Sequence, residues 1–225
     1  MKAMILAAGR GERMRPLTDL TPKPLLKAGG LPLLEHTIVR LSESGFREVI
    51  VNTAHLGEQI VEYFGDGSRW GVNLQYSPEE TALETGGGIF RALPMLGSEP
   101  FLVINGDIAC DFPYETLRQR KIPLAHLVLV PNPPHHPTGD FSLSEDGLVQ
   151  SEGSEKFTFC GVGVYRPELF SDCQEPRFPL APLLRSAMGK EAVTGEIFGG
   201  FWMDIGTVER LEAFNRHLSV LTDGV

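Results

Sequence analysis

Cysteine is scarce in this chain, which has only three in 225 residues: Cys110, Cys160 and Cys173. None of them forms a Cys-x-x-Cys pair, and an odd number cannot be fully paired within one chain. These two facts argue against a zinc ribbon and against a disulfide framework. Because free thiols suit a reducing compartment, we expect a cytoplasmic protein.

Long hydrophobic runs are also lacking. No apolar stretch approaches the roughly 20 residues that a membrane-spanning helix needs. The chain begins with a strand-like segment after a single lysine, without the apolar core and small-residue cleavage site of a secretory signal. We therefore expect neither a membrane partner nor export.

Positive charge is in the minority, because 29 acidic residues stand against 20 basic ones and the net charge is −9. Such a chain repels nucleic acid backbones and anionic lipids, so we expect no nucleic acid partner. The exception is the N-terminus, where residues 1–27 hold six basic and two acidic residues. The first loop is thus a local positive region in an acidic protein.

Apolar runs of strand length alternate along the chain with segments of helical periodicity. The predicted strands cover residues 3–7, 49–52, 101–105, 127–130 and 159–165, with a weaker one over 198–205. The predicted helices cover residues 33–44, 57–64, 88–96 and 208–218. This alternation predicts a single α/β domain over residues 1–225, a three-layer α/β/α sandwich with a mainly parallel, Rossmann-like sheet. The Pro- and Gly-rich stretch 131–156 is expected to form a small inserted β region.

The segment 6–25, LAAGRGERMRPLTDLTPKPL, directly follows the first predicted strand, and a loop in that place faces the ligand crevice of a parallel sheet. Gly9 and Gly11 let backbone N–H groups approach an anion, while Arg13 and Lys23 can hold a triphosphate by charge-assisted hydrogen bonds. A dinucleotide fingerprint would need a glycine at position 14, which is methionine, and no P-loop motif is present. The loop is therefore predicted to bind phosphate in another way, and a dehydrogenase is disfavoured.

Two aspartates follow predicted strands that are far apart in the sequence. Asp107 ends the apolar run FLVINGD, and Asp204 lies in GGFWMDIGT just before the last predicted helix. If both reach the carboxyl edge of the sheet, they supply the hard oxygen ligands that Mg²⁺ prefers, with substrate phosphates completing its coordination. Taken alone, Asp107 is explained equally well as the end of a strand, and Asp204 as the cap of a helix.

These motifs together resemble those of the sugar-1-phosphate nucleotidylyltransferases. The loop matches the family signature LAAGxGxRxxPLTxxxPKP at nearly every defined position, and NGD and WxDIGT match the family's metal-binding motifs. The resemblance implies a nucleotide-diphospho-sugar transferase fold, Mg²⁺ as cofactor, and a nucleoside triphosphate and a sugar 1-phosphate as substrates. It implies that Arg13, Lys23 and Asp107 are catalytic and that Asp107 and Asp204 hold the metal.

The resemblance also implies which residues bind the two substrates. On the nucleotide side it points to the first loop, the LETGGG segment and two residues upstream of it: Ala8, Gly9, Gly11, Glu12, Arg13, Lys23, Ser77, Glu80, Thr85 and Gly86. The glycines of LETGGG are expected to let backbone groups meet the edge of a base. On the sugar-phosphate side it points to Asn105, Gly139, Asp140, Glu152 and Lys156. The chain departs from the family here, because Glu152 is followed by glycine rather than by the usual Lys-Pro, and Lys156 is the candidate replacement.

Within the family, the short form and the segments LETGGG and GGFWMDIGT are most similar to bacterial uridylyltransferases that use UTP and N-acetylmuramic acid α-1-phosphate in cell-wall recycling. That sugar carries a lactyl carboxylate, which predicts a cation or a cluster of N–H groups nearby. Mannose-1-phosphate guanylyltransferase and glucose-1-phosphate thymidylyltransferase are alternatives, as is a binding module that senses nucleotide sugars without turnover.

The remaining expectations concern assembly and one pair of histidines. The short form implies no C-terminal β-helix, and we expect a monomer or a small homo-oligomer. His135 and His136 are flanked by prolines and have no spaced third ligand, so they are expected to lie in an exposed loop rather than to bind a metal.

Overall fold

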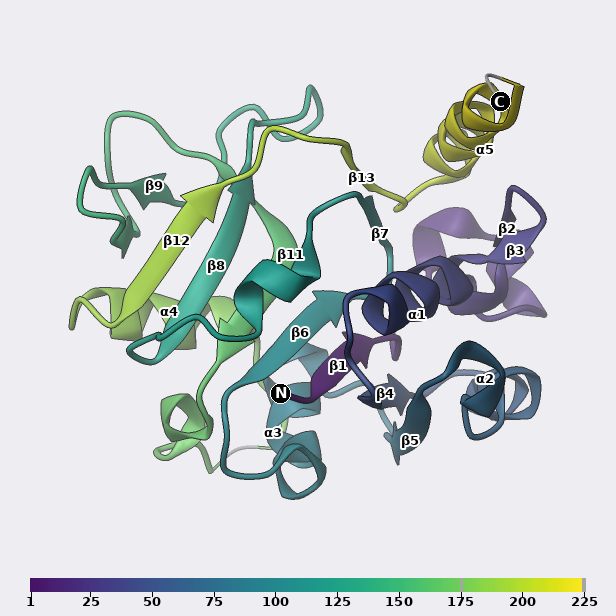
Figure 1. The fold of residues 1–225 in the computed structure, drawn as a ribbon, viewed down its shortest axis with the longest axis horizontal. Coiled ribbons are helices and arrows are strands. Elements are labelled where there is room, and N and C mark those ends of the chain that lie inside the picture. Colours follow the sequence, from purple (N-terminus) through teal and green to yellow (C-terminus); the bar gives the residue numbers. More distant parts are fainter. Residues whose placement is uncertain (175, 224–225) are drawn as a thin grey trace.

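The computed structural model describes residues 1–174 and 176–223. Its centre is a seven-stranded sheet in the order β12-β8-β11-β6-β1-β4-β5 (Figure 1). These strands are β1 (Ala3–Leu6), β4 (Glu48–Thr53), β5 (Asn73–Pro78), β6 (Phe101–Asn105), β8 (Ala125–Val130), β11 (Thr158–Tyr165) and β12 (Val193–Ile197). Within this sheet, β11 runs antiparallel to β6 and β8, and the other neighbouring pairs are parallel. The prediction of a mainly parallel sheet is confirmed.

Short strand pairs and helices surround this sheet. The pairs, all antiparallel, are β2 (Lys27–Ala28) with β3 (Leu31–Pro32), β7 (Ile108–Cys110) with β13 (Trp202–Asp204), and β9 (Ser142–Leu143) with β10 (Val149–Gln150). The helices are α1 (Leu33–Glu43), α2 (Gly57–Phe64), α3 (Glu84–Leu96), α4 (Leu180–Met188) and α5 (Val208–Asp223). Among the described residues, no helix combines the length and the apolar character that crossing a membrane requires.

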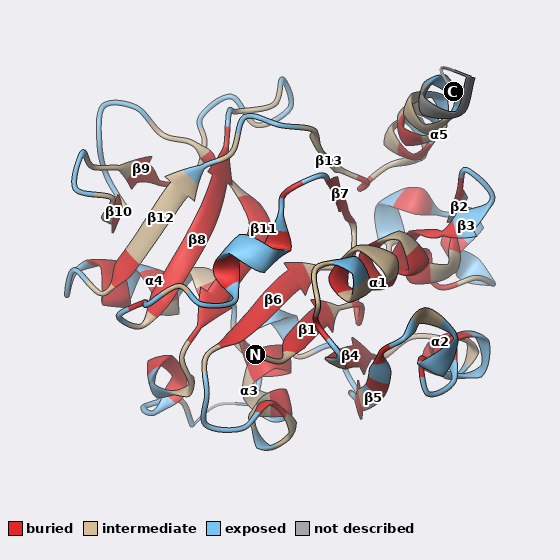
Figure 2. Ribbon diagram, viewed as in Figure 1, coloured by how far each residue is buried: buried red, intermediate tan, exposed pale blue. Residues whose placement is uncertain are grey.

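The helices cover the sheet as two separate layers (Figure 1). α1 and α2 pack on one face in a cluster that includes Ile5 of β1, and α3 and α4 pack on the other face in a cluster that includes Met4. Neighbouring residues of β1 thus enter opposite cores, and both are fully buried, which explains why this strand is apolar without alternation. Figure 2 shows the central strands buried, with exposed residues gathered on loops and outer helices. The predicted three-layer sandwich is confirmed.

β1, α1 and β4 form the predicted βαβ unit, in which β1 and β4 are parallel neighbours joined through α1. In α1, Leu34, Ile38 and Leu41 recur at helical spacing and are fully buried, so one apolar face holds the helix against the sheet. The inserted stretch 131–156 contains the β9-β10 hairpin, as predicted.

Other boundaries differ from the prediction. The strand predicted over 198–205 is confined to β13, residues 202–204, because Gly199 and Gly200 interrupt the extended chain, and β12 ends at Ile197 before the predicted stretch begins. The helix predicted from Gly88 begins four residues earlier, at Glu84. β5, β12 and α4 were not predicted. β5 and β12 are edge strands with few buried positions. α4 carries a proline in its first turn, where a missing N–H costs nothing.

Candidate active site

A cavity of about 470 Å³ lies at the carboxyl ends of neighbouring strands of the sheet. Ala7 and Ala8 follow β1, Asn52 is near the end of β4, and Asn105 ends β6. The walls are completed by the first loop, the segment before α3 and Gly206. A volume of this order suits a small-molecule ligand.

The first loop owes its path to a few specific contacts. Gly11 has φ +65°, and a Cβ there would lie 2.9 Å from Thr18 Cγ2, so only glycine fits the turn without strain. The Thr18 hydroxyl donates a hydrogen bond to the Gly11 carbonyl at 2.9 Å. Met14, at the position where a dinucleotide fingerprint would need glycine, is fully buried against Ile205 and Leu211. The loop is therefore anchored to the region that carries Asp204.

Lys23 and Asp107 form an ion pair inside this cavity. Lys23 Nζ lies 2.7 Å from Asp107 Oδ2, and the two side chains are 11% and 37% exposed. A nearly buried ammonium group is costly without a partner, so Asp107 is what permits Lys23 to lie there in the free protein. The second oxygen, Asp107 Oδ1, makes no hydrogen bond to the described part of the chain.

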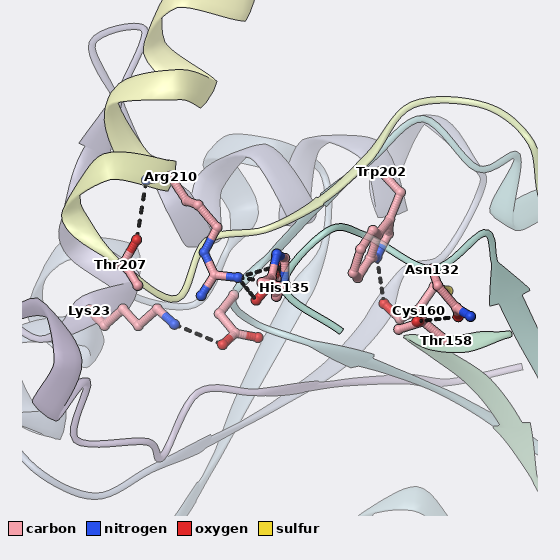
Figure 3. A network of polar contacts seen from close by, with 10 residues as sticks. Lys23, Asn132, His135, Thr158, Cys160, Trp202, Thr207 and Arg210 are labelled. Carbon is pink, nitrogen blue, oxygen red and sulfur yellow. Dashed lines mark hydrogen bonds and ion pairs between the residues drawn. The ribbon is translucent and has the colours of Figure 1, made fainter. Parts of the chain in front are cut away.

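Asp204 lies next to Asp107 although 97 residues separate them in the sequence. β13 pairs with β7 so that Asp204 is opposite Ile108, and Ile205 N donates to the Asp107 carbonyl at 2.6 Å. The Asp204 carboxylate accepts from Arg210 Nη1, which lies 2.7 Å from its Oδ2, and His135 Nε2 lies 3.0 Å from its Oδ1. Figure 3 shows Lys23 and Arg210 reaching this region from different elements, with His135 beside Arg210.

A buried polar chain supports the opposite wall of the cavity. Asn52 Oδ1 accepts a hydrogen bond from Ala7 N at 2.7 Å, and Asn52 Nδ2 donates to Glu79 Oε1 at 2.7 Å. Glu79 Oε2 in turn accepts from Leu83 N at 2.9 Å. Asn52 and Glu79 are 3% and 6% exposed, so this chain fixes the first loop relative to the start of α3.

The comparison with known proteins identifies the family of this chain. The sequence profile of the family described as "Nucleotidyl transferase" matches residues 2–156. The chain belongs to the nucleotidyl transferase family. It is 52% identical over 221 residues to the N-acetylmuramate alpha-1-phosphate uridylyltransferase of Neisseria meningitidis serogroup B, covering 94% of this chain and 96% of that one.

One further relative supports this assignment, and one solved structure shows the fold. An enzyme of the same name from Caulobacter vibrioides is 31% identical over 220 residues, which cover 91% of each chain. A solved Bacillus anthracis structure described as a glucose-1-phosphate thymidylyltransferase superposes with a TM-score of 0.85 at 21% identity, covering 96% of this chain and 94% of that one. The structural match shows that the nucleotidyl transferase has the fold that the sequence predicts.

Most residues predicted for the nucleotide side come together in this nucleotidyl transferase. The cavity is lined by seven of them: Ala8, Gly9, Gly11, Glu12, Arg13, Lys23 and Thr85. Ser77, Glu80 and Gly86 lie outside that lining: Ser77 is buried in β5, Glu80 is exposed, and Gly86 is buried under Phe178. Glu79, Ala82 and Glu84 line the cavity in their place.

The residues predicted for the sugar phosphate divide into two groups. Asn105 lines the 470 Å³ cavity together with Asp107. Lys156 lines a second cavity of about 480 Å³, and its Nζ is paired with Glu152 Oε2 at 3.0 Å. Lys156 therefore lies outside the lining of the first cavity, and the structure offers no support for it as the replacement for the missing family lysine.

Gly139 and Asp140 belong to the inserted region. Gly139 packs against the Lys156 carbonyl. Asp140 accepts a hydrogen bond from Phe159 N at 2.9 Å and is paired with His136 at 3.1 Å. Because Phe159 is two residues before Gly161, which packs against the Asn105 side chain, Asp140 is connected through β11 to the edge of the first cavity.

The structure places His135 and His136 in a loop, as expected. His135 is 47% exposed and His136 38% exposed at the side chain, as an exposed loop requires. Each histidine also lies against a carboxylate: His136 contacts Asp140, and His135 contacts Asp204 of the candidate site. Within the described residues there is no group of three or more His, Cys, Asp or Glu that could hold a metal.

The cysteines are not nucleophiles in this site. Burial raises the pKa of the Cys110 thiol to about 11 and raises the pKa of Cys160 well above its usual value. Both thiols are therefore protonated at neutral pH and unsuited to nucleophilic attack.

The glycines of α3 have a packing role that differs from the predicted one. A Cβ on Gly87 would lie 2.3 Å from the Pro176 carbonyl oxygen and 3.2 Å from Arg177 Cα. Gly87 N donates to the Phe178 carbonyl at 3.1 Å. Gly86 and Gly87 thus admit residues 176–178, and Gly88 admits the Asn52 and Glu79 side chains, whereas we expected these glycines to admit a base. Glu84 adopts φ +62° and pairs with Arg177 at 3.2 Å.

Gly87→Ala is expected to lower the free energy of unfolding by about 1–3 kcal/mol, because backbone atoms cannot yield as a side-chain end can. For a chain of this size each kcal/mol corresponds to a shift in Tm of about 2–4 °C. Differential scanning calorimetry measures the change. Gly199→Ala is the matched control, since a Cβ there meets nothing within 4 Å; equal Tm values for the two variants would contradict the packing role.

Proposed function

We propose that this nucleotidyl transferase transfers a uridylyl group from UTP to N-acetylmuramic acid α-1-phosphate, giving the UDP-sugar and pyrophosphate. The observation that carries the proposal is the single cavity in which the glycine-containing loop, Lys23 and Asp107 meet. The choice of base and sugar rests on the Neisseria and Caulobacter relatives, which carry that name and match the chain over nearly its full length.

The proposed reaction is one in-line displacement. An oxygen of the sugar 1-phosphate attacks the α-phosphorus of the triphosphate, the bond from that phosphorus to the bridging oxygen of the β-phosphate breaks, and pyrophosphate leaves with the electron pair. No covalent enzyme intermediate is needed, which agrees with the protonated thiols. Lys23 would hold phosphate oxygens and Arg13 would meet the charge that develops on the leaving group, so catalysis depends on positioning and electrostatics.

Asp107 and Asp204 fit a magnesium ion. Their backbones are neighbours through β7 and β13, and Asp107 Oδ1 is not engaged by the described residues. One or two carboxylates, completed by substrate phosphates, is the donor set that this ion prefers. When bound, Mg²⁺ supplies charge neutralisation and Lewis-acid polarisation of the phosphoryl oxygens.

The remaining assignments are part of the same proposal. Backbone groups of Ala8, Gly9 and Gly11 would contact the triphosphate. The further residues assigned to the nucleotide are Glu12, Ser77, Glu80, Thr85 and Gly86. The residues assigned to the sugar phosphate are Asn105, Gly139, Asp140, Glu152 and Lys156. The protein would act as one catalytic domain in the cytoplasm, as a monomer or small homo-oligomer, in peptidoglycan recycling.

The alternatives are less well supported. Mannose or glucose 1-phosphate would be the acceptor in the guanylyl- and thymidylyltransferase alternatives, but the 52% identity to a muramate enzyme favours the uridylyl reaction. A sensing module without turnover would be expected to lose one of the charged groups, whereas Arg13, Lys23, Asp107 and Asp204 are all present.

A matrix of substrates tests the proposed function. Four nucleoside triphosphates are combined with a panel of sugar 1-phosphates in Mg²⁺, and pyrophosphate release is followed. We expect the highest kcat/KM for UTP with N-acetylmuramic acid α-1-phosphate. A higher value for GTP with mannose 1-phosphate, or for dTTP with glucose 1-phosphate, would overturn the specificity, and no release from any pair would overturn the enzyme function.

A further inference from the structure

Two arginine side chains reach the same edge of the first cavity. A Cβ on Gly206 would lie 2.6 Å from Arg210 Nη2 and 3.0 Å from Arg13 Nη2, so both guanidinium groups lie beside one point. Gly206 itself lines the cavity. Two like charges brought so close repel each other unless an anion lies between or beside them.

Arg210 is held in place but retains free donors. Its Nη1 donates to Asp204 Oδ1 at 2.8 Å and contacts His135 Nε2 at 2.7 Å, and its backbone N–H is capped by Thr207 Oγ1 at 3.3 Å. Its Nη2, the atom beside Gly206, makes no hydrogen bond within the described residues. A guanidinium group offers five N–H donors, so those on Nη2 remain available to a ligand.

The position of Arg210 in α5 is unfavourable without an anionic partner. Arg210 is the third residue of α5, which begins at Val208, and the positive end of the helix dipole disfavours a cation there. Asp204 compensates in the free protein. The Arg210 side chain is 18% exposed, and a second anion beside it would offset the cost of its burial further.

Before substrates bind, some cations of the site are paired with carboxylates and one is not. Lys23 is paired with Asp107 and Arg210 with Asp204, while Arg13 has no ion pair among the described residues. A phosphate monoester brings about −1.5 to −2 charges at neutral pH, in addition to those of the triphosphate. Arg13 and Lys23 alone do not balance both substrates.

We propose that Arg210 binds the phosphate group of the acceptor sugar 1-phosphate at Gly206. This inference rests on the proposed function, because the phosphate that Arg210 would bind belongs to the sugar 1-phosphate substrate of that function. Arg210 lies on the acceptor side because His135, its hydrogen-bond partner, comes from the inserted region that carries Gly139 and Asp140. Lys156 is paired with Glu152 beside a different cavity.

Steady-state kinetics of Arg210→Gln tests the inference. Losing a charged donor pair is expected to raise KM for the sugar 1-phosphate about 10- to 100-fold, while KM for UTP changes by less than about threefold. Arg210→Lys keeps the charge but not the planar fork, so it should recover part of the loss. The matched control is Arg216→Gln, an exposed arginine on the same helix, which should behave as the wild type.

Two readouts without turnover make the test independent of activity. Arg210→Gln leaves Asp204 without its counter-ion, so Mn²⁺ titrated into the free protein and followed by electron paramagnetic resonance should bind several-fold more tightly than in Arg216→Gln. Calorimetry with the sugar 1-phosphate should show weaker binding. Opposite changes for metal and acceptor are not expected from general loss of structure.

The outcomes separate the inference from the proposed function. A rise confined to KM for UTP places Arg210 on the nucleotide side and overturns the inference, as do unchanged constants for both substrates. If the wild type turns over no pair of substrates, the proposed function fails. The anion site is then tested by calorimetry with inorganic phosphate, and equal affinity for phosphate in wild type and Arg210→Gln would overturn the inference about Arg210.

Discussion

Replacing Asp107 with asparagine is expected to lower kcat by about 10³-fold, the equivalent of about 4 kcal/mol of transition-state stabilisation. The variant keeps the shape of the side chain but removes the negative charge that both Lys23 and a divalent ion require. Asp107 lies on the cavity lining and pairs with Lys23 at 2.7 Å. Initial rates of pyrophosphate release, measured over a range of Mg²⁺ concentrations, give kcat and the metal dependence together.

The control for this experiment is Asp111→Asn, an exposed aspartate four residues along the chain, which should retain wild-type kcat. Circular dichroism should show that both variants are folded, since no large apolar contact is lost. Full activity of Asp107→Asn at the wild-type Mg²⁺ requirement would remove Asp107 from the metal site. Asp204→Asn offers a second ligand variant, for which we expect a loss of similar order.

Replacing Arg13 with alanine is expected to lower kcat about 10²- to 10³-fold, with KM for UTP changed by less than about threefold. The reason is that an interaction with charge developing on the leaving group is stronger in the transition state than in the ground state. Arg13 is exposed, lines the cavity and makes no ion pair within the described residues, so its charge is available to substrate.

Arg15→Ala is the matched control, because Arg15 is paired with Asp19 at 2.6 Å and does not line the cavity. Its kinetics should match the wild type within about twofold, as expected for an exposed ion pair. An effect of Arg13→Ala on KM alone would mean that Arg13 contributes to ground-state binding and not to the chemical step.

The elements that the sequence predicted well are those with a strong local pattern. β1, α1, β4 and β6 have either continuous apolar runs or a clear helical repeat, because their side chains are buried on both faces or on one stripe. β5 and β12 are the edge strands of the sheet, and at an edge fewer side chains are buried, so the pattern weakens. The apolar run over 198–205 misled because its aromatic residues enter two different clusters, Phe198 and Trp202 one and Phe201 the other, and Gly199-Gly200 interrupts the strand structure.

The candidate site likewise contains residues that the sequence predicted and residues that it missed. Arg13, Lys23 and Asp107 lie together where the sequence placed them, because each follows or neighbours a strand that ends at the same edge. Arg210 was missed, although a cation in the first turn of a helix is a signal that some anion compensates the dipole. Asn52 was missed as well, although an amide at the end of an apolar strand indicates a buried polar partner.

By itself, the sequence determined the layers, the parallel core and the chemistry of the first loop, because burial pattern, glycine spacing and charge are properties of contiguous residues. Only the tertiary structure decided which distant groups meet: Asp204 beside Asp107, His135 and Arg210 on Asp204, and the 176–178 backbone on α3. Such contacts depend on how strands and helices pack across the whole sheet, and no local stretch of residues encodes that packing.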